Sequence, residues 1–153
     1  MAIKKIACCT DFSENAKEAV MTAIEMAGKY RARLSIIHIL PPVVNPMVGE
    51  GSWIITDEPK ESLILKLEEQ MQKEYGAKIG ENIKYDFVVL DGHISTEILK
   101  YLEENQTDVV IMGSFGLSGM GLVFFGSVAK RVAHKAPCSV MIVRRQEKVQ
   151  GKP

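Results

Sequence analysis

Short apolar runs alternate along this chain with longer segments whose apolar residues recur at helical spacing. The apolar runs are typical of β-strands and cover residues 3–9, 34–40, 83–90, 107–112 and 138–143. The segments between them predict helices over residues 14–30, 59–77, 95–104 and 127–135. Ser13 can cap the first helix, and Pro59 suits the first turn of the second. Strands and helices therefore alternate along nearly the whole chain.

This alternation predicts an α/β fold with a single doubly wound, Rossmann-like sheet of five parallel strands and helices on both faces. Several of the strands are apolar at successive positions, as burial on both faces requires. Ligands bind such sheets beyond the carboxyl ends of the strands, where the winding reverses. The first and fourth strands end in polar segments, 10–13 and 113–116. If these two strands are neighbours, both segments face one crevice.

Length and composition narrow the class of protein further. The 153 residues predict one domain over 1–145, followed by a polar tail, 146–153, that we expect to be frayed. Lys+Arg and Asp+Glu balance at 19 each, which argues against a nucleic-acid partner. No apolar run is long enough to cross a membrane and no signal peptide is recognisable, so we expect a cytoplasmic protein. Cys8, Cys9 and Cys138 lie in apolar runs and are expected to be reduced thiols.

A glycine-rich loop is the strongest sign of function. Residues 113–127, GSFGLSGMGLVFFGS, lie between a predicted strand and a predicted helix. Glycine lets the backbone approach a ligand closely, and the helix start offers N–H groups and partial positive charge to an anion. The loop contains no lysine, so it lacks the Gly-Lys-Ser/Thr of a Walker A loop. Its position in the chain does not fit a dinucleotide fingerprint either. Phosphate would be held by backbone amides and small hydroxyls, chiefly at Gly116, Gly126, Ser127 and Val128. The alternative is a flexible loop without a ligand.

The spacing of Gly113, Gly116 and Gly126-Ser127 resembles the Gly-x2-Gly-x9-Gly-Ser/Thr pattern of ATP-binding universal stress proteins. Residues 10–16, TDFSENA, are similar to the segment that follows the family's first strand, and 136–140, APCSV, to its closing segment. His38-Ile39 resembles the family's His-Val. The likeness covers about residues 3–144. It implies the strand order 3-2-1-4-5 of the adenine nucleotide alpha hydrolase-like folds.

The resemblance also implies a nucleotide site. Thr10 and Asp11 would line the crevice, with Asp11 towards the adenosine or a phosphate-bound metal, and Ile39 would contact adenine through its backbone. Gly113 and Gly116 would border the ribose and phosphates, whereas Gly126, Ser127 and Val128 would hold the phosphates. The ligand is then ATP, or ADP or AMP, with Mg²⁺ as a further candidate bound through the phosphates. Cys9 departs from the proline or small residue that many members have.

Several alternatives stay open at this point. The chain is either a regulatory nucleotide-binding protein or a slow Mg²⁺-dependent ATPase or phosphoryl-transfer enzyme, although the loop has no lysine for that chemistry. A third reading is an interaction module without a site. Asp11 could simply turn or cap the following helix, and each of the three histidines is expected to be a surface or hydrogen-bonded side chain. The role of residues 41–58, which contain three prolines, stays undefined.

The last predicted strand indicates a homodimer. Residues Cys138 to Val143 are apolar at nearly every position, and in the family's strand order this strand lies at the edge of the sheet. An apolar edge strand invites pairing with another chain, and a two-fold axis would hide both edges. The alternative is an edge covered by the polar tail.

Overall fold

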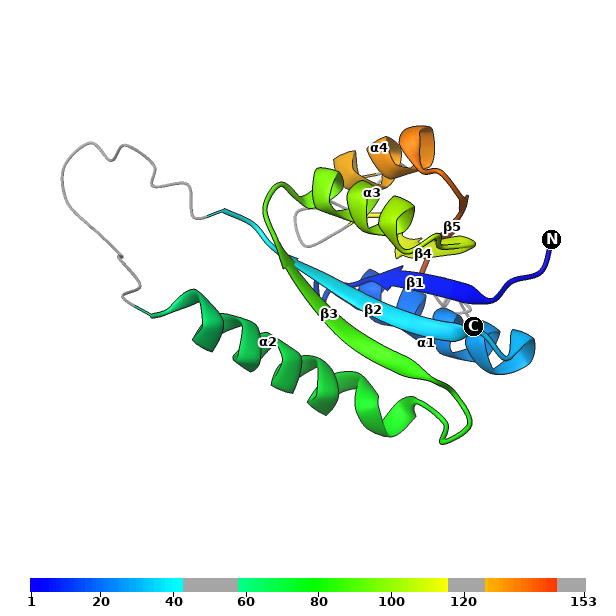
Figure 1. Ribbon diagram of the computed structural model, residues 1–153, viewed down its shortest axis with the longest axis horizontal. Helices are drawn as coiled ribbons and strands as arrows, with labels where there is room; N and C mark the ends of the chain where they lie inside the picture. The colour runs from blue at the N-terminus through cyan, green and yellow to red at the C-terminus, as the bar shows by residue number, and fades with distance from the viewer. Residues whose placement is uncertain (43–57, 116–125, 146–153) are drawn as a thin grey trace, which may run out of the picture.

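The computed structural model describes residues 1–42, 58–115 and 126–145. Five parallel strands form one sheet in the order β3-β2-β1-β4-β5 (Figure 1). The strands are β1 Lys5–Cys9, β2 Arg33–Leu40, β3 Tyr85–Asp91, β4 Val109–Gly113 and β5 Ser139–Val143. The helices are α1 Glu14–Tyr30, α2 Lys60–Tyr75, α3 Ile94–Glu104 and α4 Ser127–Lys135, with a short 3-10 helix at Gly76–Lys78. The predicted doubly wound α/β fold and its strand order are confirmed.

The helices cover the two faces of the sheet in pairs. α1 and the end of α2 pack on one face, where the buried residues include Ile6, Cys8, Ala23, Leu34, Ile36, Met71, Tyr75 and Ile111. α3 and α4 pack on the other face, whose buried residues include Ala7, Ile37, Ile39, Ile98, Leu102, Val110, Met112, Ala129 and Val132. Side chains of one strand divide between the two clusters because they alternate from face to face. This is why the central strands are apolar at most successive positions.

Strand boundaries differ from the prediction by at most two residues, and Asp108 lies where two of the differences occur. Its carboxylate accepts the backbone N–H groups of Lys4 and Lys5, at 2.8 and 2.9 Å. These bonds satisfy backbone donors at the start of β1, which begins at Lys5, and Asp108 itself directly precedes β4, which begins at Val109. The same N–H groups, Lys4 first, lower the pKa of Asp108.

The predicted turn at Asp91-Gly92 begins one residue later than expected. Asp91 pairs with Leu40 and is the last residue of β3. Gly92 then turns the chain with a φ of 136°, a value that side-chain-bearing residues rarely adopt, and its N–H donates to the Leu40 carbonyl at 3.1 Å. A side chain at position 92 would therefore strain the turn.

Candidate functional site

The strand order reverses between β1 and β4. These strands pair directly, from Ile6 with Val109 to Cys8 with Ile111. The chain leaves β1 towards α1 on one face of the sheet, whereas α4 lies on the opposite face. Neighbouring strands that lead to opposite faces separate their following loops, which is the arrangement in which open α/β sheets bind ligands. The two polar segments predicted to share a crevice therefore follow adjacent strands.

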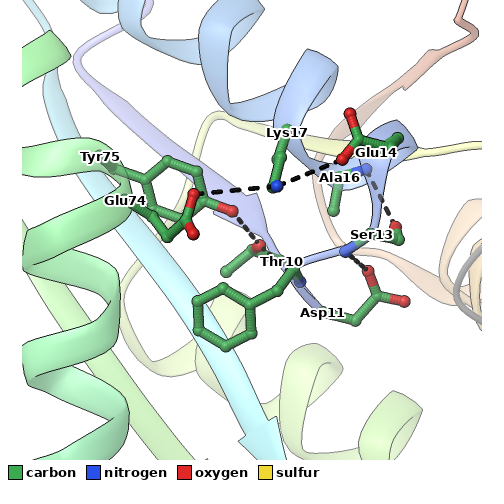
Figure 2. Close-up of polar contacts among 9 residues, drawn as sticks. Thr10, Asp11, Ser13, Glu14, Ala16, Lys17, Glu74 and Tyr75 are labelled. Atoms are coloured by element: carbon green, nitrogen blue, oxygen red, sulfur yellow. Dashed lines mark hydrogen bonds and ion pairs between the residues drawn. The ribbon is translucent and has the colours of Figure 1, made fainter.

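Thr10 fixes the loop that follows β1. Its N–H donates to the carbonyl of Ile37 at 2.8 Å, and its Oγ1 accepts the N–H of Phe12 at 3.1 Å. The same hydroxyl lies 2.7 Å from the Tyr75 hydroxyl, at the end of α2 (Figure 2). Thr10 is 5% exposed. Its side chain therefore holds the loop together, and any part it has in lining the crevice comes through the loop's shape.

Asp11 and Ser13 continue the loop into α1. The Asp11 Oδ1 atom accepts the N–H of Ser13 at 3.0 Å, and the Ser13 Oγ accepts the N–H of Ala16 at 3.2 Å (Figure 2). The second bond caps α1 as predicted. The first shows that Asp11 does have the turn-forming role that the sequence left open. Its contact with adenosine or a metal stays a prediction.

The ring of Phe12, in this loop, packs against those of His38 and Tyr75. Phe12 adopts a φ of 63°, in the left-handed region, and its ring lies 5.0 Å from that of His38 and 6.3 Å from that of Tyr75, centre to centre. The Phe12 and Tyr75 planes are nearly parallel, at 3°. The Nδ1 atom of His38 lies 2.9 Å from the carbonyl oxygen of Thr10. His38 is thus a hydrogen-bonded histidine, as expected, whereas sequence reasoning missed Tyr75, because a tyrosine on a helix has no local signal of such a contact.

The backbone of Ile39 faces the end of β1. Ile37 directs its carbonyl towards β1, since that carbonyl accepts the Thr10 N–H. In a strand, the N–H and C=O of one residue point to one neighbouring strand, and those of the next residue point to the other. The backbone groups of Ile39 therefore point to the same side as those of Ile37. β1 has ended at Cys9, the partner of Ile37. The polar backbone edge of Ile39 therefore faces the region beyond β1, as contact with an adenine base would require.

The start of α4 is tied to the end of β4. The Gly126 N–H donates to the Ser114 carbonyl at 2.7 Å, and the Ser114 N–H donates to the Val143 carbonyl of β5 at 3.1 Å. The first helical bond runs from Lys130 N–H to the Gly126 carbonyl, so the N–H groups of Ser127 and Val128 precede it and point out of the helix end. The Ser127 side chain is exposed. This end of α4 can hold an anion with two backbone donors and a hydroxyl.

Two of the predicted glycines owe their identity to chain packing. A Cβ on Gly113 would lie 3.1 Å from the backbone carbon of Asn15, and one on Gly126 would lie 3.2 Å from the Phe115 Cα. Gly126 has a φ of −58°, which any residue adopts. A side chain at position 126 would therefore crowd the backbone of Phe115, which is a packing reason for glycine that needs no ligand. Gly116 lies outside the described residues.

The site residues thus fall into two groups. Thr10, Asp11 and Ile39 lie at the ends of β1 and β2, and Gly113 ends β4 beside the start of α1. Gly126, Ser127 and Val128 begin α4 and are joined to β4 through Ser114. All these segments belong to the carboxyl-terminal edge of the sheet. Their contact with a nucleotide stays a prediction.

Tyr75 should make the protein's stability fall at alkaline pH. Burial raises the pKa of Tyr75 to about 12 from an ordinary 10.0, although its bond with Thr10 acts in the opposite direction. Because the folded-state value is the higher one, the neutral phenol stabilises the fold fully below pH 10, and this contribution is lost as the pH rises from 10 to 12. We expect the loss to be roughly 1–3 kcal/mol in urea titrations.

Tyr75→Phe is the matched variant for this measurement. Burial also raises the pKa of Cys9, to about 12, so both proteins share the thiol contribution to alkaline unfolding. The free energy of unfolding of the parent should therefore fall more steeply than that of Tyr75→Phe. Parallel profiles would contradict the assignment.

The described part of the chain contains no helix that is both long and apolar enough to span a membrane. Within the same residues, no three His, Cys, Asp or Glu side chains gather in a way that could hold a metal ion. The cytoplasmic location stays a prediction.

The model of the universal stress protein family matches residues 2–144. A universal stress protein of Methanocaldococcus jannaschii is 33% identical over 153 aligned positions, which cover 95% of this chain and 84% of the relative. The chain therefore belongs to the universal stress protein family, as its glycine spacing and the segment after its first strand indicated.

Two solved structures share the fold and contain nucleotides. A universal stress protein in complex with cAMP has a TM-score of 0.68 at 20% identity, over 94% of this chain and 98% of its own. The universal stress protein of Archaeoglobus fulgidus in complex with dAMP has a TM-score of 0.58 at 18% identity, over 94% and 99%. At these identities the likeness establishes the fold alone.

Proposed function

We propose that this universal stress protein binds an adenine nucleotide, ATP or else ADP or AMP, at the carboxyl-terminal edge of its sheet. The observation that carries the proposal is the start of α4, where exposed Ser127 and two backbone N–H groups lie beside the end of β4 at the point of strand reversal. A helix start of this kind favours phosphate through its N–H groups and its partial positive charge. The family relatives solved with cAMP and dAMP support an adenine nucleotide.

The two ends of the proposed nucleotide would meet different parts of the site. The backbone edge of Ile39 suits the base, because adenine has one donor and several acceptors on its edges. Ser127 and Val128 suit the phosphates. Asp11, in the loop between β1 and α1, would lie towards the adenosine or a Mg²⁺ ion held by the phosphates. Gly113 would border the ribose, and Gly116 is assigned to the phosphates from its spacing alone.

A regulatory role fits these residues better than turnover. Phosphoryl transfer needs cations to neutralise the developing charge and a positioned nucleophile. Lys130 and Arg131 lie one turn into α4 and are exposed, so solvent screens their charge. A slow Mg²⁺-dependent ATPase remains the alternative. We further propose a cytoplasmic homodimer that pairs through β5.

Titration calorimetry with ATP and with GTP tests the function. We expect saturable binding of ATP and much weaker binding of GTP, because the backbone edge of Ile39 would meet a different donor pattern on guanine. With Mg²⁺ present, phosphate release should stay far below roughly 1 per second, the lower end of ordinary enzyme turnover. Absence of ATP binding would contradict the proposal. Release at several per second that is lost in an Asp11 variant would favour the ATPase.

A further inference from the structure

The last turn of α2 contacts the loop that follows β1 through a buried hydroxyl pair. The Tyr75 hydroxyl lies 2.7 Å from the Thr10 Oγ1, and Tyr75 is 1% exposed. That Oγ1 also accepts the N–H of Phe12, the residue with left-handed backbone. Figure 2 shows the contact between Tyr75 and Thr10. Together with the Phe12 bond, it forms one hydrogen-bonded chain from α2 through Thr10 into the backbone of the loop.

The ring of Tyr75 reinforces this contact. The Phe12 ring stacks on the Tyr75 ring with an interplanar angle of 3°. This stacking holds the side chain of Phe12, whose backbone is in the left-handed region. A left-handed conformation at a phenylalanine persists only where its surroundings impose it. The hydroxyl pair and the stacked rings are such surroundings, so the loop's shape depends on Tyr75.

A second link between α2 and the loop region is weaker. Lys17 of α1 lies 3.2 Å from a Glu14 carboxylate oxygen and 3.9 Å from one of Glu74 (Figure 2). Both glutamates are exposed by a third or more, and exposed ion pairs contribute little. Tyr75 therefore carries most of the connection.

α2 is held to the sheet mainly near its carboxyl end. Its buried residues are Met71 and Tyr75, both in the last two turns, whereas Leu65 is 60% exposed. The same tyrosine thus anchors the helix and shapes the loop. Two functions that share one buried side chain are energetically coupled, and such coupling is reciprocal.

We propose that Tyr75 is a positioning residue for the nucleotide, and that nucleotide binding is coupled through it to the docking of α2. This inference rests on the proposed function. The Thr10–Ser13 loop is in its binding shape only while Tyr75 holds Thr10 and Phe12. A bound nucleotide that prefers this shape therefore holds the end of α2 against the sheet.

Calorimetry with ATP on the parent, Tyr75→Phe and Tyr101→Phe tests the proposal. Tyr75→Phe keeps the ring and removes the hydroxyl, so ATP affinity should fall about fivefold to tenfold, the worth of one hydrogen bond. Tyr101 is partly exposed on α3 and packs against the opposite face, so Tyr101→Phe should keep the parent's affinity. Thr10→Val removes the other hydroxyl and with it the acceptor of the Phe12 N–H, so it should cost more than Tyr75→Phe. The two changes combined should cost no more than Thr10→Val alone.

Hydrogen exchange gives the readout that a purely structural role would not move. ATP should slow exchange of the backbone amides in residues 67–75 of the parent and of Tyr101→Phe, but much less in Tyr75→Phe. A Tyr75→Phe protein with the parent's affinity and the parent's ATP-dependent protection overturns the proposal. If Tyr75→Phe does not fold, Thr10→Val is measured in its place. An ATP affinity of Thr10→Val equal to that of the parent overturns the proposal. If the parent itself binds no ATP, the proposed function fails first.

Discussion

Replacing Ser127 by aspartate should weaken ATP binding by about 100-fold or more, because it sets a carboxylate against the phosphates at close range. The same change should leave the protein folded. Ser127 is exposed and is the first residue of α4, where a negative side chain interacts favourably with the helix dipole. Stability and affinity should therefore move in opposite directions, which no general loss of structure would produce.

Ser127→Ala is the matched control. It removes the hydroxyl and adds no charge, so its ATP affinity should fall by about tenfold at most, the worth of one hydrogen bond. Gly126→Asp brings the same charge but also places a Cβ 3.2 Å from the Phe115 Cα, so it confounds binding with packing. Calorimetry and urea unfolding on the same samples decide the matter. Ser127→Asp with the parent's affinity would show that α4 does not hold the phosphates.

Changing Met141 to lysine should convert the proposed homodimer into monomers. β5 is an edge strand of the described sheet, and Met141, its central residue, is 37% exposed. If two copies pair their β5 strands around a two-fold axis, the two residues at 141 lie near that axis and near each other. Two lysines there repel, and we expect dimer affinity to fall by about 100-fold or more.

The backbone of β5 explains why a side-chain change is the better test. The Ser139 N–H donates to the carbonyl of Asp108, the residue before β4, and the Val143 carbonyl accepts the N–H of Ser114, the residue after it. Because backbone N–H and C=O groups alternate in direction from residue to residue, those of Met141 point towards β4. Those of Val140 and Ile142 point outwards, where a partner strand would pair. A proline at 141 would damage the sheet itself.

Light scattering at micromolar concentration measures the outcome. The parent should have twice the 17.0 kDa mass of one chain, and Met141→Lys should have the mass of one. Leu65 of α2 is 60% exposed and gives the control, because α2 packs against β3, at the opposite edge of the sheet from β5. Leu65→Lys adds the same charge there and should stay dimeric. A parent of 17.0 kDa would contradict the dimer.

The sequence determined the fold of this protein because its signals are local and repeated. Short apolar runs that alternate with helical segments predict strands buried on both faces. Ser13 caps α1 through its own side chain, as its position before the helix predicts. The glycine spacing and residues 10–16 likewise identified the family. The alternation of elements therefore predicted the doubly wound sheet, and the family resemblance implied its strand order.

Tertiary structure decided what depends on contacts between distant segments. No sequence pattern pairs Thr10 with Tyr75, which are 65 residues apart, or brings Lys4 and Lys5 to Asp108. The spacing predicted Gly126 to be a ligand-binding glycine, but only the fold shows that a Cβ there would also crowd the backbone of Phe115. Local propensity is encoded within a few neighbouring residues, whereas these contacts arise only when the sheet brings its strand ends to one edge.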